Sequence, residues 1–124
     1  MFNADGNLRE RTKTFAHRVA DAFESLPKGK RLAQVWGDQM LRAGGSVGAN
    51  YREAQRGRSQ AEYVSKLGDC LREADETLYW MELLEERGYF SVKRIAPIQK
   101  EAGELMAIFI TLIRKGCAGK NLKT

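Results

Sequence analysis

The sequence predicts an all-α protein, an up-and-down antiparallel four-helix bundle. Apolar residues recur at steps of three and four through almost all of its 124 residues, which is the periodicity of amphipathic helices. The chain has only two prolines, Pro27 and Pro97, too few for a fold of many short strands. A chain of this length usually forms one domain, so we expect residues 1–124 to form a single bundle. The four expected helices cover approximately residues 8–26, 30–56, 59–87 and 92–115.

The helix expected at 8–26 ends at a proline. Its apolar residues step by three and four along one face: Phe15, Val19, Ala22, Phe23 and Leu26. Proline cannot continue the hydrogen-bond ladder of a helix, and it disfavours helical geometry in the residue before it. Pro27 is therefore expected to end this helix, and the residues after it to form the turn into the next one.

The helix expected at 30–56 contains a glycine-rich stretch, Gly44-Gly45-Ser46-Val47-Gly48. One interpretation is a phosphate-binding loop, but the lysine and the following serine or threonine of a P-loop are missing. The other interpretation is an uninterrupted helix, in which Gly44 and Gly48 let a neighbouring helix approach closely. Helical periodicity runs through the stretch, so the sequence favours the uninterrupted helix.

The helix expected at 59–87 begins with a capping-box sequence, Ser59-Gln60-Ala61-Glu62. In such a box the serine hydroxyl accepts a hydrogen bond from the amide of Glu62, and the Glu62 carboxylate accepts one from the amide of Ser59. Gly88 is expected to end this helix, because glycine readily adopts the left-handed conformation found after helix ends.

The helix expected at 92–115 follows Ser91, a good N-cap residue. Pro97 should remove one hydrogen bond or bend the helix, and the tail from Gly116 onward is expected to fray. Residues 105–113 are apolar nearly all round, whereas a surface helix of a monomer needs only one apolar stripe. We therefore expect further copies of the chain to cover the extra apolar faces in a ring-like homo-oligomer. The candidates for that interface are Met106, Ile110 and Ile113.

Charge is distributed unevenly along the chain, whose net charge is +5. Residues 1–58 carry a surplus of five positive charges, residues 59–88 a surplus of five negative charges, and residues 89–124 again five positive. The acidic segment can pair with basic neighbours within the chain or between copies, and an exposed basic surplus attracts polyanions. No apolar run approaches the roughly 20 residues of a membrane span, and no secretory signal is recognisable. We therefore expect a soluble, cytoplasmic protein without membrane association.

Few residues could carry catalysis or hold a metal. Two cysteines, Cys70 and Cys117, and one histidine, His17, are too few for a structural zinc site or a disulfide scaffold. Carboxylates on the two middle helices invite a di-iron interpretation, but that chemistry needs Glu-x-x-His on two helices. We therefore expect no cofactor, no metal and no enzymatic activity. The polar residues of these helices are predicted to form a structural network that fixes helix register: Ser46, Asn50, Glu53, Glu73 and Glu76.

Basic residues gather where the first helix passes the end of the second. Antiparallel packing places residue 10 beside residue 55 and brings two basic groups together. Guanidinium groups bind phosphates through pairs of hydrogen bonds, so this surface is predicted to bind nucleic acid: Arg9, Arg11, Arg52, Arg56 and Arg58. No base-reading module or aromatic platform accompanies them, so the binding is expected to depend on shape and charge. Ordinary solvated helix surface is the alternative.

The second and third helices also carry a resemblance to a known family. It rests on the segments Ser46-Val47-Gly48-Ala49-Asn50-Tyr51-Arg52-Glu53-Ala54 and Glu73-Ala74-Asp75-Glu76-Thr77-Leu78-Tyr79-Trp80-Met81-Glu82-Leu83-Leu84. With these segments the chain resembles the four helix bundle proteins, also called 23S rRNA-intervening-sequence proteins, over roughly residues 10–115. The resemblance implies an all-α bundle that assembles as a ring, typically a homopentamer, with Asn50 and Glu53 as signature positions of architectural role.

The resemblance also bears on function. The family includes reading frames within split ribosomal RNA genes and accessory proteins of diversity-generating retroelements. The latter are basic pentamers thought to bind nucleic acid and a reverse transcriptase. We therefore expect a non-enzymatic, oligomeric bundle that binds RNA or DNA without strong sequence preference, with a reverse transcriptase as a further partner if one is encoded nearby. The alternative is a structural scaffold whose partner is another polypeptide and which has no nucleic-acid role.

Overall fold

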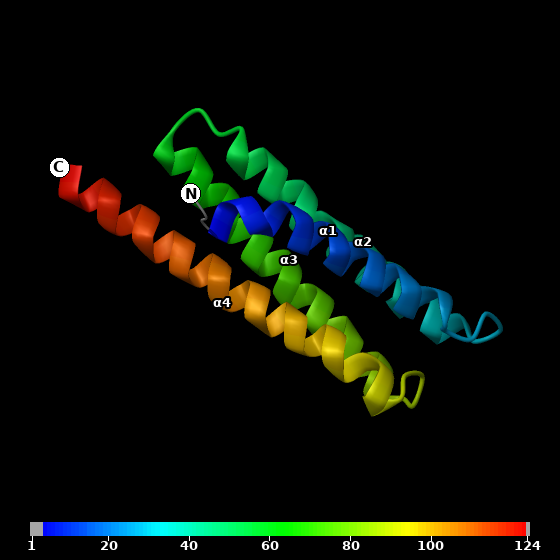
Figure 1. Ribbon diagram of the computed structural model, residues 1–124. Helices are drawn as coiled ribbons and strands as arrows, with labels where there is room; N and C mark the ends of the chain where they lie inside the picture. Colours follow the sequence, from blue (N-terminus) through cyan, green and yellow to red (C-terminus); the bar gives the residue numbers. More distant parts are fainter. Residues whose placement is uncertain (1–3, 124) are drawn as a thin grey trace.

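The computed structural model describes the backbone of residues 4–123, and in this part of the chain it contains four helices and no strand (Figure 1). The helices are α1 (Ala4–Glu24), α2 (Arg31–Gln55), α3 (Gln60–Glu86) and α4 (Val92–Lys123). Short turns join them, so consecutive helices run antiparallel. The prediction of an all-α four-helix bundle is confirmed.

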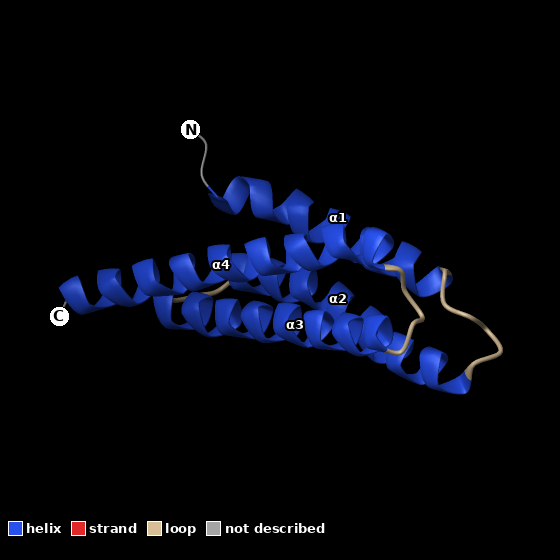
Figure 2. Ribbon diagram, turned by 90° about the horizontal axis from the view of Figure 1, so that it is seen from below, coloured by secondary structure: helices blue, strands red, loops and turns tan. Residues whose placement is uncertain are grey.

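Each helix packs against its two neighbours in a closed circuit. α2 contacts α1 and α3, α4 contacts α3, and α1 returns to contact α4. Figure 2 shows the same arrangement from below, with α1 and α4 on one side of the bundle. The core between the helices holds fully buried aromatic and aliphatic side chains from all four of them, including Phe15, Tyr51, Leu67 and Phe109. The rings of Tyr51 and Phe109 pack with their centroids 6.3 Å apart.

Helix α2 runs without interruption through the glycine-rich stretch, which confirms the helical interpretation over the P-loop. Gly37, Gly44 and Gly48 face side chains of α1 and the turn that follows it. A Cβ atom built at Gly44 would lie 2.8 Å from Cγ1 of Val19, and one at Gly48 would lie 3.1 Å from Oγ1 of Thr12. Glycine at these positions therefore allows α1 and α2 to pack closely.

The expected helix caps are present, with one difference. The Ser59 hydroxyl accepts a hydrogen bond from the Glu62 amide at 3.1 Å, as predicted. The Glu62 carboxylate, however, accepts from the amide of Arg58 at 3.1 Å, not from that of Ser59. The turn thus brings the residue before the cap within reach of the carboxylate. Gly88 has a φ of 81° after the end of α3, and the Ser91 hydroxyl accepts from the Arg94 amide at 3.1 Å.

Two expected boundaries were wrong. Helix α1 begins at Ala4 instead of residue 8, and α4 continues to Lys123 instead of ending at residue 115, whereas the other helix ends lie within two residues of the expected ones. Gly116 is buried, and a Cβ atom there would lie 2.5 Å from Cγ2 of Val64 in α3. The glycine allows close contact between two helices, so it does not mark a frayed end. α4 also remains a single helix across Pro97.

The apolar segment 105–113 of α4 is partly covered by its own bundle. Met106 and Ile113 pack against the core, and Ile110 is half-buried. Among the described residues, the large apolar side chains that are exposed lie elsewhere: Val35 at 44%, Tyr79 at 52% and Val92 at 64%. An assembly through Met106, Ile110 and Ile113 therefore stays a prediction.

Candidate nucleic-acid interface

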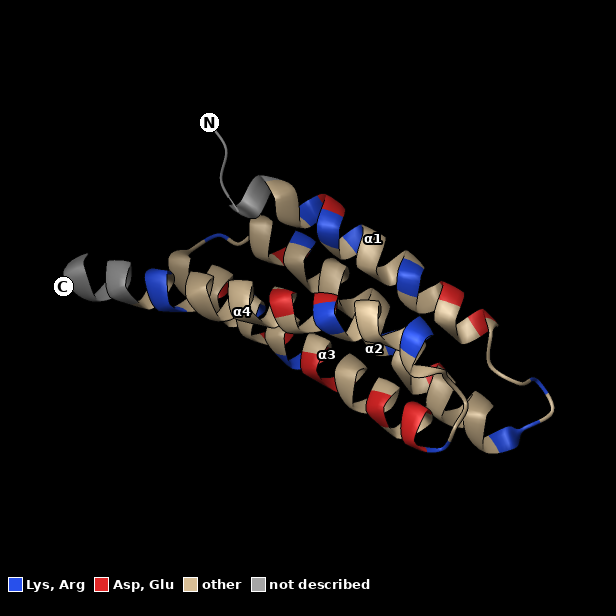
Figure 3. Ribbon diagram, turned by 60° about the horizontal axis from the view of Figure 1, so that its bottom comes forward, with Lys and Arg blue, Asp and Glu red and all other residues tan. Residues whose placement is uncertain are grey.

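A groove of about 300 Å³ runs between α1 and α2. Three cationic side chains line it, Arg9 and Lys13 from α1 and Arg52 from α2. Its other lining residues are small or short: Thr12, Ala16, Gly45, Gly48 and Ala49. We call this surface, defined by these eight residues, the basic groove. Figure 3 shows Lys and Arg segments, in blue, recurring along α1.

The close approach of the two helices at Gly48 determines the shape of this groove. Thr12 is buried there, and its hydroxyl donates a hydrogen bond to the carbonyl of Leu8 at 2.7 Å. The hydroxyl is therefore satisfied within α1, although it lies against α2. Small residues on the facing side of α2 leave helix backbone, not side chain, as the groove surface.

The three cations of the basic groove are exposed. Arg9 donates from Nη1 to Oε1 of Gln55 at 2.9 Å, which confirms the predicted pairing of residue 10 with residue 55. Within the described part of the chain, none of Arg9, Lys13 and Arg52 forms an ion pair with a carboxylate. Their positive charge is therefore available to an external anion.

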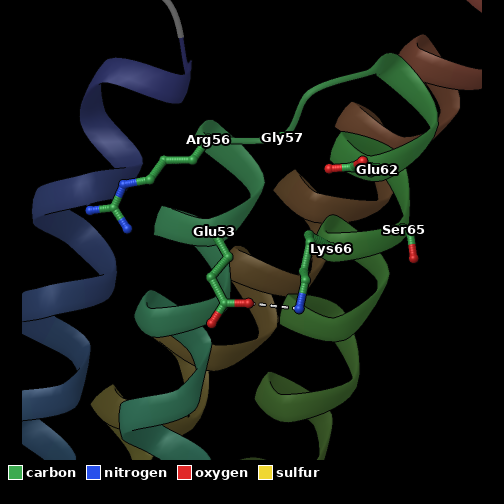
Figure 4. Close-up of a pocket in the computed structure, with 6 residues that line it drawn as sticks. All are labelled: Glu53, Arg56, Gly57, Glu62, Ser65 and Lys66. Carbon is green, nitrogen blue, oxygen red and sulfur yellow. Dashed lines mark ion pairs between the residues drawn. The ribbon is translucent and has the colours of Figure 1, made fainter.

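Arg56 and Arg58 lie at the end of α2 and in the turn after it. Figure 4 shows the Arg56 side chain extending from the end of α2 toward α1. Arg58 lines a separate shallow hollow at the α2–α3 turn, together with Ser59 and Gln60. Neither of these two predicted residues lines the basic groove: Arg56 lines the hollow between α2 and α3, and Arg58 lies on the turn.

Arg11 does not belong to this surface, which corrects the prediction. Its guanidinium forms a two-point hydrogen bond with Glu101 of α4, at 2.7 and 3.1 Å, and a third contact at 3.0 Å with Glu104. These carboxylates raise the pKa of Arg11, chiefly through the hydrogen bond that its guanidinium donates to Glu101. Arg11 therefore links α1 to α4, and its charge is neutralised there.

The predicted polar network between α2 and α3 does not form as expected. The Ser46 hydroxyl donates to the carbonyl of Arg42 at 2.9 Å, and the Asn50 amide donates to the carbonyl of Ser46 at 2.9 Å, both inside α2. A side chain bonded to its own helix cannot fix the register of a neighbour. Glu53 does reach α3, but its partner is Lys66 at 2.7 Å, and its side chain is 54% exposed.

This ion pair lies in a second hollow of about 380 Å³, between α2 and α3 (Figure 4). The hydrogen bond from Lys66 to Glu53 raises the pKa of the lysine. Charges of both signs line the hollow, with Glu62 and Arg56 beside the pair. An exposed, internally compensated pair contributes little to stability, and the hollow offers no surplus charge to a ligand.

Glu73 and Glu76 both lie on α3, but neither bonds to the predicted partners on α2. Glu73 is mostly buried, and its carboxylate approaches Arg72 of the same helix at 3.7 Å. Burial, followed by the nearby charge of Glu76, raises the pKa of Glu73. Glu76 is exposed. No group of three or more metal-ligating side chains occurs in the part of the chain that the structure describes, and no helix there is long and apolar enough to cross a membrane.

The sequence-based prediction of the basic surface omitted Lys13 and Gly45. Lys13 follows Arg9 by one helical turn, a spacing that places both on one face of α1. That signal was available in the sequence. Gly45 gave no such signal: the sequence assigned the close helix contact to Gly44 and Gly48, and only the packed structure places Gly45 in the groove.

Comparisons with known proteins agree with this architecture. The family model of the 23S rRNA-intervening sequence protein matches residues 4–111. A crystal structure of a protein of unknown function from the S23 ribosomal protein family of Bacteroides thetaiotaomicron is 33% identical in sequence. The similarity covers 85% of this chain and 96% of that one, with a TM-score of 0.79. No curated protein sequence matches the chain.

Proposed function

The chain belongs to the 23S rRNA-intervening sequence protein family, and we propose that it binds nucleic acid. The similar crystal structure is of a protein with unknown function, so the proposal rests on the surface of this chain. Binding takes place without catalysis, through phosphate contacts in the basic groove. The observation that carries this proposal is the groove itself, with three exposed cations and no carboxylate paired to them among the described residues.

The chemistry of the groove favours the backbone of the nucleic acid over its bases. Arg9, Lys13 and Arg52 supply charge and hydrogen-bond donors, which suit phosphate oxygens. The other lining residues are small, so the groove has no aromatic side chain on which a base could stack. Contacts to phosphates position a protein on nucleic acid without reading its sequence. We therefore expect weak discrimination between sequences.

The affinity for nucleic acid is expected to fall steeply with salt. Three neutralised phosphates correspond to a slope of roughly −2 for a single strand and roughly −2.7 for a duplex in the logarithmic salt dependence. Between about 50 and 200 mM salt the affinity then decreases roughly 20-fold for the strand and roughly 40-fold for the duplex. The measurement is fluorescence anisotropy of a labelled uridine oligonucleotide of about 20 nucleotides, longer than usual single-strand sites, and of a duplex DNA of the same length.

A pair of charge variants distinguishes the contribution of the basic groove to the affinity from that of the protein's overall positive charge. Replacing Arg9, Lys13 and Arg52 together with glutamine should flatten the salt slope and abolish most of the affinity at the lower salt. The matched control replaces three exposed cations at the other end of α2 from Arg52, Lys28 and Lys30 in the preceding turn and Arg31 at its first residue, and should leave binding nearly unchanged. Absence of wild-type binding at the lower salt contradicts the proposal, and so does equal loss in both variants.

The proposal includes assembly into a ring-like homo-oligomer, which repeats the basic groove around the ring. It rests on the apolar character of residues 105–113 and on the alternation of basic and acidic segments along the chain. Light scattering is expected to give a mass that is a multiple of the 14.0 kDa chain, most simply five copies. A stable mass of one chain at micromolar concentration contradicts the assembly but not the proposed binding in the groove, which lies within one chain.

A scaffold with a polypeptide partner is the second candidate, because a partly exposed aromatic cluster lies between α2 and α3, with Trp36 and Trp80 packed against the core and Tyr79 exposed. The ring centroids of Trp36 and Trp80 lie 6.3 Å apart, and those of Tyr79 and Trp80 lie 5.1 Å apart. Val35 and Tyr79 are exposed on the same two helices. Exposed aromatic residues are enriched at protein interfaces. If the anisotropy experiment gives no binding, this surface becomes the stronger candidate.

A further inference from the structure

The basic groove contains one glycine that close packing between helices does not require. Gly37, Gly44 and Gly48 of α2 each face a neighbouring side chain at 3.1 Å or less from a Cβ atom built on them. Gly45 has no heavy atom within 4 Å of such a Cβ atom, and it is exposed. A glycine inside a helix costs about 1 kcal/mol relative to alanine. At position 45 no contact within the chain offsets that cost.

The space above Gly45 lies among the cations of the groove, since Gly45 lines it together with Arg9, Lys13 and Arg52. From this placement we infer that the sugar–phosphate backbone of one nucleic-acid strand lies directly against α2 at Gly45, with its phosphates held by these three side chains. The inference rests on the proposed function. It adds the place of contact on the protein, Gly45, and the part of the ligand that makes this contact, the sugar–phosphate backbone.

The physical reason is access. A phosphodiester strand is several ångströms wide, and cations at the groove edges can reach its oxygens from both sides only if it settles between them. Any side chain at position 45 would stand in that space, whereas glycine leaves helix backbone exposed there. Close approach of a ligand to a protein backbone is one of the few structural needs that glycine meets and alanine does not.

An open environment alone does not mark a glycine as functional. Gly68 of α3 and Gly103 of α4 also have no heavy atom within 4 Å of a built Cβ atom. Neither of them lines the basic groove. Gly45 differs from them by the three cations around its open space, and Gly103, which is also exposed on a helix, provides a matched control.

The test compares Gly45→Gln with Gly103→Gln. Glutamine is uncharged, is a good helix former and is long enough to occupy the groove, so neither variant should lose stability. The probes are the same labelled uridine oligonucleotide and the duplex DNA, which share the phosphodiester chemistry and separate a single strand from the edge of a duplex. Gly45→Gln should weaken binding of the probe that occupies the groove about tenfold or more at low salt, as expected when phosphate contacts are lost. Gly103→Gln should bind like the wild type.

The failure of this inference can be distinguished from the failure of the proposed function. Gly45→Gln could bind both probes like the wild type while the triple variant of Arg9, Lys13 and Arg52 does not bind. In that case the nucleic acid contacts the cations but does not lie against Gly45, and the inference is wrong. If the wild type binds neither probe, the proposed function and the inference both fall. If Gly103→Gln weakens binding as much as Gly45→Gln, the effect does not come from the groove, and the inference is also wrong.

Discussion

Replacing Phe109 with alanine is expected to lower the free energy of unfolding by about 3–5 kcal/mol, the usual cost of removing a buried phenyl ring. Phe109 is fully buried in α4 and packs against Tyr51 of α2, with ring centroids 6.3 Å apart. The ring thus fills the centre of the bundle between two helices that are not neighbours in the circuit. Its removal leaves a cavity that the surrounding helices can close only in part.

The measurement is urea unfolding followed by circular dichroism, together with the melting temperature. For a chain of this size the loss corresponds to a decrease of about 10–20 °C. If Phe109→Ala does not fold, Phe109→Leu retains most of the apolar volume and should lose less stability. Val92→Ala, at a side chain 64% exposed, is the control and should change little. A loss under about 1 kcal/mol for Phe109→Ala would place this ring outside a well-packed core.

Alanine substitutions at the adjacent glycines 44 and 45 are expected to change stability in opposite directions. A Cβ atom at Gly44 would lie 2.8 Å from Cγ1 and 3.1 Å from Cβ of Val19. Valine is β-branched and has one strongly preferred rotamer in a helix, so it cannot turn away. Gly44→Ala therefore forces α1 and α2 apart, and overpacking of this kind costs about 1–3 kcal/mol. Gly45→Ala meets nothing within 4 Å and should gain up to about 1 kcal/mol.

Comparing the two variants isolates the packing effect. Both replace glycine with alanine in the same turn of α2, so the gain in helix propensity is nearly the same and cancels in the difference. Urea unfolding of both variants should show Gly45→Ala as the more stable by about 1–3 kcal/mol or more. Equal stabilities would mean that α1 and α2 are not in close contact at Val19. The pair also controls for the binding experiment, because it shows how a substitution at position 45 affects folding alone.

Much of the fold could be predicted from local sequence signals. The number and order of helices follow from apolar periodicity, because each helix must bury one face. The caps at Ser59 and Ser91 depend on a serine hydroxyl and the backbone amide three residues later, both encoded in a few adjacent residues. The pairing of Arg9 with Gln55 follows from antiparallel packing joined by a short turn.

The candidate site could be predicted only in part. Arg9 and Arg52 were expected to share a surface, and both line the basic groove. Arg11 was expected beside them, but it pairs with Glu101 of α4. A residue near the edge of a helix face can turn toward either neighbouring helix, and periodicity does not distinguish the two. The carboxylates that pair with Arg11, those of Glu101 and Glu104, are 90 and 93 positions away in the chain.

By itself the sequence determined the features that depend on residues close together in the chain. These are the four helices, their caps and turns, the apolar faces, and the segments that carry surplus charge. The tertiary structure alone decided what depends on distances between helices. It placed Val19 against Gly44 and nothing against Gly45, buried Gly116 beside Val64, and paired Arg11 with Glu101. The physical reason is that packing acts between atoms over a few ångströms, and residues far apart in the chain come that close only when the helices assemble.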